Sequence, residues 1–76
     1  MMKPRDLSGE LWRVYDFQFD GPGRVYKIDE PRLLWVGETT HRVLDSKGIM
    51  HLVPAPGHLG CVVQWKPRNA EEPVQF

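Results

Sequence analysis

The imidazole and thiol side chains of this sequence, which could bind a transition metal or act as a base or a nucleophile, lie in its second half. They are three histidines and a single cysteine: His41, His51, His58 and Cys61. Imidazole and thiolate groups are zinc ligands, but a structural zinc site takes four of them, and no CxxC or HxxxH spacing is present. His58 and Cys61 could act as a base and a nucleophile, yet no residue that would orient the base is recognisable. We therefore predict a protein without a cofactor and without enzymatic activity.

The clearest structural pattern in the sequence surrounds the first two of these histidines. Two runs typical of β-strands, residues 39–44 and 49–53, flank the four-residue sequence Asp-Ser-Lys-Gly. Asp45 favours the first position of a type I turn, and Gly48 tolerates the positive φ angle that follows such a turn. These residues are therefore predicted to form a β-hairpin.

The predicted turn also sets the register of the hairpin. A type I turn with a bulge at its glycine places His41 opposite Val53 and Val43 opposite His51. All four side chains then share one face, with the two imidazoles on a diagonal and about 7 Å between their Cα atoms. A metal ion could bridge that distance, and the remaining histidine or the cysteine could supply a further ligand. Because strand histidines are more often ordinary surface or half-buried residues, we do not favour this metal site.

The rest of the sequence repeats the pattern of short β-forming runs separated by glycine and proline. Seven glycines and seven prolines leave intervals that suit strands better than helices. We expect five or six strands, at residues 11–19, 24–28, 33–36, 39–44, 49–53 and 61–65. The predicted fold class is all-β, a small five- to six-stranded antiparallel barrel or a strongly curved sheet of SH3 or OB size.

Three further expectations concern particular segments. The continuously apolar run Leu33–Val36 is predicted to be a strand that is covered on both faces at the centre of the core. One short helical turn between Asp6 and Val14 competes with the start of the first strand, because apolar residues recur there with helical spacing. Residues 1–8 and 68–76 are expected to be loosely attached termini.

Length and composition indicate a single domain, residues 1–76, with little reserve of stability. A chain of this size buries only about 60% of its unfolded surface. One cysteine allows no disulfide within the chain, so self-association is the expected source of further stability. Ten basic and ten acidic residues give a net charge of zero, which disfavours a nucleic-acid partner.

The sequence also bears on location. No apolar run reaches the ~18 residues of a membrane span, and the N-terminus lacks the apolar stretch of a signal peptide. Together with the lone thiol, these features predict a cytoplasmic protein with no membrane partner.

Aromatic and basic residues supply the functional hypothesis. Trp, Tyr and Arg are enriched at the hot spots of protein interfaces. We predict a non-enzymatic interaction module that self-associates and binds a protein partner, with at least one exposed tryptophan and an interface at Trp12, Arg13, Trp35 and Trp65. The alternative is a barrel that stacks single-stranded nucleic acid on aromatic side chains between basic residues. The third hypothesis is the metal site of the hairpin.

Overall fold

The structure is a computed structural model, and it describes residues 3–17, 25–57 and 60–75. Within these ranges the regular structure is made of β-strands, and no α-helix occurs, so the predicted all-β class is confirmed. The strands are β1 (Arg5–Asp6), β2 (Glu10–Phe17), β3 (Val25–Asp29), β4 (Pro31–Val36), β5 (Thr40–Asp45), β6 (Met50–Pro54), β7 (Cys61–Pro67) and β8 (Val74–Gln75).

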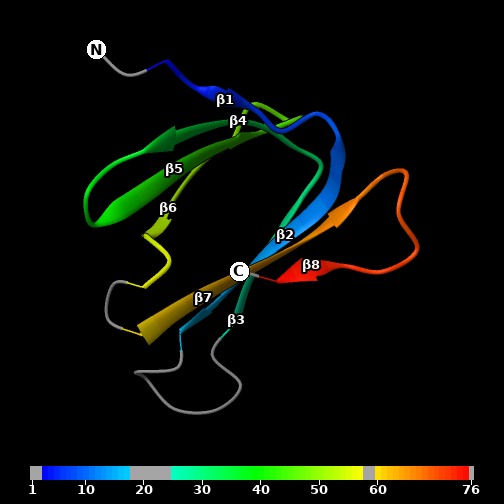
Figure 1. Ribbon diagram of the computed structural model, residues 1–76. Coiled ribbons are helices and arrows are strands. Elements are labelled where there is room, and N and C mark those ends of the chain that lie inside the picture. Colours follow the sequence, from blue (N-terminus) through cyan, green and yellow to red (C-terminus); the bar gives the residue numbers. More distant parts are fainter. Residues whose placement is uncertain (1–2, 18–24, 58–59, 76) are drawn as a thin grey trace.

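The strands form two antiparallel sheets. The first sheet has the order β1-β4-β5-β6 and the second has the order β3-β2-β7-β8. Figure 1 shows the two sheets as separate layers, with a strongly curved β2 that runs from beside the first sheet into the second. The six longer strands match the six predicted runs, and β1 and β8 are additions of two residues each. Among the described strands no ladder joins the two sheets, so the molecule is a curved two-layer arrangement and not a closed barrel.

The chain passes from the second sheet to the first at a corner formed by a single residue, Glu30. This residue has a φ of 52°, in the left-handed region that side chains other than glycine disfavour. Its backbone is held on both sides: the Glu30 N–H donates to the Leu11 carbonyl (2.9 Å), and the Ser46 N–H donates to the Glu30 carbonyl (2.9 Å). The Glu30 carboxylate also pairs with Arg68. These contacts offset the strain and place β3 and β4 in different layers.

The core lies between the facing sides of the two sheets. Every second residue of a strand points to the same face, and here Tyr15, Val63 and Ile28 of the second sheet meet Leu34 and Val43 of the first. Each of these side chains is at most 2% exposed. The inward-facing positions of both sheets therefore form one core.

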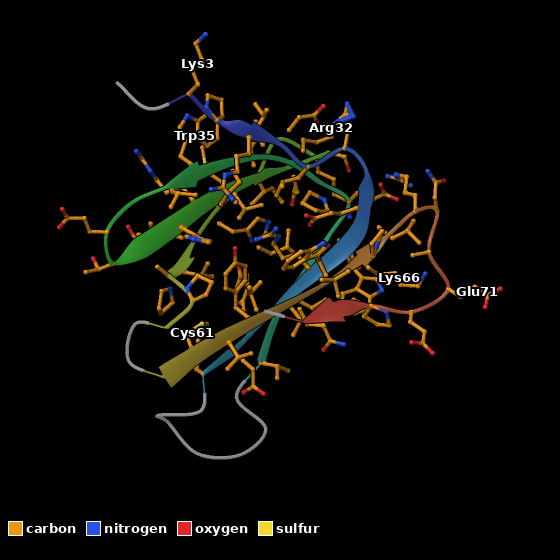
Figure 2. All side chains as sticks on the ribbon, in the orientation of Figure 1. Lys3, Arg32, Trp35, Cys61, Lys66 and Glu71 are labelled. Atoms are coloured by element: carbon orange, nitrogen blue, oxygen red, sulfur yellow. The ribbon has the colours of Figure 1, made fainter. Side chains whose placement is uncertain are left out.

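The apolar run Leu33–Val36 is not covered on both faces, and that prediction is wrong. Leu34 faces the second sheet and is 1% exposed, whereas Leu33 and Trp35 alternate to the other side of β4 and are half-buried. Figure 2 shows Trp35 next to Lys3, at the outer side of the first sheet. No described strand lies over that side, and an apolar run does not itself reveal whether a second layer covers it.

The helical turn that competed with the first strand between Asp6 and Val14 does not form. A tight turn occupies this place, closed by a hydrogen bond from the Glu10 N–H to the Leu7 carbonyl (2.9 Å), and β2 begins directly after it. The Asp6 carboxylate accepts a hydrogen bond from the Ser8 N–H (2.9 Å). Short polar side chains often make such local bonds to the backbone, and these bonds compete with helix formation.

Parts of both terminal segments, 1–8 and 68–76, are paired with the sheets. β1 pairs with β4, and β8 pairs with β7. Leu7 is buried and belongs to the core, and the Arg68 N–H donates to the Gly9 carbonyl (2.8 Å). These contacts connect the two ends of the described chain near the start of β2.

The hairpin of β5 and β6 has the predicted turn and register. The Gly48 N–H donates to the Asp45 carbonyl (3.1 Å), and Gly48 has a φ of 84°. The Asp45 carboxylate further accepts the backbone N–H groups of Lys47 (2.9 Å) and Ile49 (3.0 Å). His41 opposes Val53 and Val43 opposes His51, so the two histidines share the inner face as predicted.

Candidate functional site

Two tyrosine–histidine pairs connect the sheets. The Tyr15 hydroxyl of β2 lies 2.7 Å from Nδ1 of His41 on β5, and the Tyr26 hydroxyl of β3 lies 2.7 Å from Nδ1 of His51 on β6. Tyr15 and Tyr26 are register partners on adjacent strands. Each imidazole of the metal site that the sequence did not favour is thus hydrogen-bonded to a tyrosine of the opposite sheet.

The exposed pair continues into the hairpin turn. Nε2 of His51 lies 2.7 Å from the Asp45 carboxylate. The hydrogen bond from His51, followed by those from the turn N–H groups, holds the pKa of Asp45 below its ordinary value. His51 therefore bridges the Asp45 carboxylate, through Nε2, and the Tyr26 hydroxyl, through Nδ1.

The remaining candidate metal ligands do not gather around this hairpin. Among the described residues no group of three or more His, Cys, Asp or Glu side chains is placed to hold a metal ion. Cys61 is 2% exposed and belongs to the core, where burial and then the charge of Asp16 raise the pKa of its thiol. His58 lies outside the described residues.

A buried polar chain extends from the other tyrosine–histidine pair. Arg13 donates from Nε and Nη2 to the two oxygens of the Glu10 carboxylate (3.0 and 2.9 Å), and from Nη1 to the Tyr15 hydroxyl (3.1 Å). The Arg13 guanidinium also lies over the ring of Trp65, at 5.1 Å. Paired charges of this kind are the form in which an arginine can be buried between two sheets.

His41 accepts the last hydrogen bond of this buried polar chain, and its imidazole is neutral. Burial, with smaller contributions from Arg13 and Arg5, lowers the pKa of His41 from 6.5 to about 4. The ring therefore presents one acceptor nitrogen and one donor nitrogen at neutral pH.

The outer side of the first sheet carries a mainly apolar surface. Register partners across β4, β5 and β6 form one row of Leu33, Leu44 and Met50, and a second row of Trp35, Arg42 and Leu52. Met50 is 49% and Leu52 is 67% exposed. We call the apolar members of these rows the outer apolar face: Leu33, Leu44, Met50, Trp35 and Leu52.

The outer apolar face ends at the free edge of β6, where the backbone pattern can be worked out from the hairpin. The Asp45 N–H donates to the Ile49 carbonyl (3.0 Å) at one end, and the Ala55 N–H donates to the Thr39 carbonyl (2.9 Å) at the other. Hydrogen-bonded pairs alternate with non-bonded pairs in an antiparallel ladder. The bonded pairs of this hairpin therefore fall at odd-numbered residues.

The even-numbered residues of β6 consequently direct their backbone groups away from β5. Met50 and Leu52 each present an N–H and a C=O at this edge, and Pro54 presents a C=O. No described strand pairs with the edge. The edge is thus a row of donors and acceptors that lies directly beside the two most exposed side chains of the outer apolar face.

The four predicted interface residues do not share one surface. Arg13 and Trp65 lie together on the inner side of the second sheet. Trp12 lies on its outer side, where the Lys27 ammonium sits 5.7 Å from the ring, and Trp35 belongs to the outer side of the first sheet. All three tryptophans are half-buried.

Sequence reasoning missed Met50 and Leu52. The available signal was that β6 is apolar on both parities, since Val53 alternates with Leu52. A strand that is apolar on both faces is typical of a strand with a second contact surface.

Comparisons with protein-family models, with curated proteins and with solved structures found no match for this chain. The part of the chain that the structure describes contains no helix with the length and apolar character that crossing a membrane requires.

Proposed function

We propose that this protein is a non-enzymatic interaction module that self-associates by pairing the free edge of β6 with the same edge of a second copy. The observation that supports this proposal is the unprotected character of that edge, which lies beside exposed Met50 and Leu52. An antiparallel edge can pair with itself in a two-fold arrangement, which closes the assembly at a dimer.

The two outermost longer strands differ in how they are protected. Natural sheets shield free edges with charged side chains and proline. β3, at the edge of the second sheet, carries Lys27 and Asp29, which lie 3.7 Å apart. β6 carries no Lys, Arg, Asp or Glu, and its proline is the last residue. This contrast favours β6 as the edge that pairs.

Backbone pairing alone does not hold such a dimer. Two copies of Met50 and Leu52 supply four N–H donors, and each net hydrogen bond contributes about 0.5–1.5 kcal/mol. Association costs about 4–15 kcal/mol in lost translational and rotational freedom. The side chains of Met50 and Leu52 must therefore contribute by burying apolar area against the partner copy.

The paired edges produce one continuous sheet of eight strands, four from each copy. The two outer apolar faces then adjoin across the dimer axis, and together they form the surface that contacts a protein partner. Trp35, with Arg42 beside it in the same row, supplies the residue types that are enriched at interface hot spots. We place this module in the cytoplasm, because its single thiol is buried and has no disulfide partner in the chain.

Sedimentation velocity over a range of concentrations tests the proposal with Leu52→Lys. Lysine at this position places a charge beside the edge, as natural edge strands do, and both copies of the dimer would carry it. We expect wild type to sediment as a dimer at high concentration and Leu52→Lys to remain monomeric. The Leu52 side chain is largely exposed, so the variant should keep its circular dichroism spectrum and melting temperature.

Val25→Lys is the matched control. Val25 is 58% exposed and lies on β3, the edge strand of the other sheet. This substitution introduces the same charge at the same type of position, and it should leave the dimer intact. If Val25→Lys dissociates the dimer and Leu52→Lys does not, or if wild type is a monomer throughout, pairing through β6 is excluded.

A further inference from the structure

A cavity of about 370 Å³ opens between the two sheets, at the end of the buried polar chain. Its walls come from both sheets: Arg5, Val36 and His41 belong to the first, and Arg13 and Trp65 belong to the second. This volume lies in the range of small-molecule sites, which are mostly apolar with a few polar groups that orient the ligand.

The hydrogen bonds of the polar chain fix which nitrogen of His41 carries the proton. A guanidinium can only donate, so the Tyr15 oxygen accepts from Arg13 (3.1 Å). Tyr15 is fully buried and its O–H has no other acceptor among the described residues, so it donates to Nδ1 of His41 (2.7 Å). A neutral imidazole that accepts at Nδ1 carries its hydrogen on Nε2.

The Nε2–H of His41 is available to a ligand. Among the described residues it has no hydrogen-bond acceptor, and no buried side-chain nitrogen or oxygen is left without a partner. Nε2 must therefore reach solvent, and the cavity is the space that His41 lines. Because the tautomer is fixed, this position offers a hydrogen-bond donor and not an acceptor.

A second donor group stands at the same cavity. Arg5 projects from the inner face of β1, opposite Leu34, and it lines the cavity. Within the described residues its guanidinium takes part in no ion pair, in contrast to Arg13, whose charge is matched by Glu10. Glu38 is the acidic side chain among the lining residues, so donors outnumber acceptors.

We propose that this cavity binds a small organic anion, a monocarboxylate with an apolar or aromatic body. The carboxylate accepts hydrogen bonds from the Arg5 guanidinium and from the Nε2–H of His41. The body packs against Trp65, Val36 and Ala55, which line the remaining wall. Arg13 and Tyr15 are positioning residues, since they act on the ligand through the tautomer of His41.

Benzoate and its neutral isostere benzamide test this proposal on the full chain. Binding is followed by ¹H–¹⁵N NMR titration at neutral pH. We expect benzoate to shift the indole N–H signal of Trp65 more than those of the other two tryptophans, and to shift the ring signals of His41. Benzamide should bind at least about tenfold more weakly, because it lacks the charge that strengthens both hydrogen bonds. Equal binding of the two probes, or no shift by benzoate, would overturn the proposal.

Three substitutions of exposed residues identify the sign of the recognised charge. Arg5→Met should weaken benzoate binding about tenfold. Arg32→Met removes the same charge from an exposed residue of β4 outside this cavity, and it should have no effect. Glu38→Gln should leave binding unchanged or tighten it. Equal losses in both arginine variants would indicate a net-charge effect, and a loss of benzoate binding in Glu38→Gln would show that this carboxylate supports binding instead of opposing it; either result contradicts the proposal.

Discussion

Removing one hydroxyl group should distinguish the buried tyrosine–histidine pair from the exposed one. Tyr15 has no exposed surface, and its hydroxyl both accepts from Arg13 and donates to His41. Tyr15→Phe leaves two buried polar groups without their partner, and each such loss costs about 1–3 kcal/mol. We expect the free energy of unfolding to fall by about 2–6 kcal/mol, a large part of the 5–15 kcal/mol typical of a domain.

Tyr26→Phe is the matched control, because it removes the same atom from a pair with the same hydrogen-bond distance of 2.7 Å. The Tyr26 side chain is 39% exposed, so water can replace its hydroxyl at His51, and His51 keeps its hydrogen bond to Asp45. The expected cost is below about 1 kcal/mol.

Urea denaturation at neutral pH, followed by tryptophan fluorescence, measures both variants. For a domain of this size each kcal/mol corresponds to about 4–8 °C in melting temperature, so a thermal scan gives an independent reading. Comparable losses in the two variants, or a smaller loss for Tyr15→Phe, would refute the reasoning that burial makes the first hydroxyl the more important one.

Two further predictions concern acid and the hairpin turn. The pKa of His41 is about 4 in the fold and 6.5 as the ordinary value, so the unfolded chain takes up a proton in this window that the folded chain does not. The free energy of unfolding should thus be largest above pH 6.5 and fall by roughly 3 kcal/mol as the pH drops toward 4; urea titrations across the window check this, and a flat profile would contradict it. Gly48→Val should cost about 1–3 kcal/mol, because Gly48 has a φ of +84°, which a β-branched residue disfavours. An added Cβ would meet no atom within 4 Å, so the cost comes from the backbone and not from a clash. Gly48→Asn, a residue that tolerates this φ, should cost clearly less, and an unchanged melting temperature for Gly48→Val would show that the turn is not strained.

The parts of the structure that could be predicted from the sequence are governed by local chemistry. Asp45 and Gly48 determine the turn through their own backbone preferences, and the turn then determines the register of its two strands. That is why His41 and His51 could be placed on one face before the fold was known. The lengths of the six main strands follow equally from glycine and proline positions nearby in the chain.

The contacts between sheets could not be predicted in this way. Tyr15 and His41 are 26 residues apart, and alternation along a strand shows which face a side chain takes but not which strand lies opposite. Glu30 turns the chain from one sheet to the other with a positive φ that its residue type does not indicate. Trp35 was assigned to a covered face because a short apolar run occurs both in strands that are covered on one face and in strands that are covered on two.

The proposed interaction edge was missed for a related reason. The sequence favoured tryptophan and arginine as interface residues on grounds of type alone. Whether β6 is an edge depends on the order of strands in the sheet, which is set by packing between distant segments. Once that order is given, the outward direction of the Met50 and Leu52 backbone groups follows from the hairpin register.

Amide hydrogen exchange of β6 at increasing protein concentration tests the central claim most directly. In the monomer the Met50 and Leu52 N–H groups point outward, while those of His51 and Val53 are bonded to β5. Pairing of two copies through this edge should slow exchange at Met50 and Leu52 as concentration rises, and leave His51 and Val53 protected throughout. If Met50 and Leu52 exchange rapidly at every concentration, including those at which the protein is a dimer, the claim that β6 pairs with a second copy is contradicted.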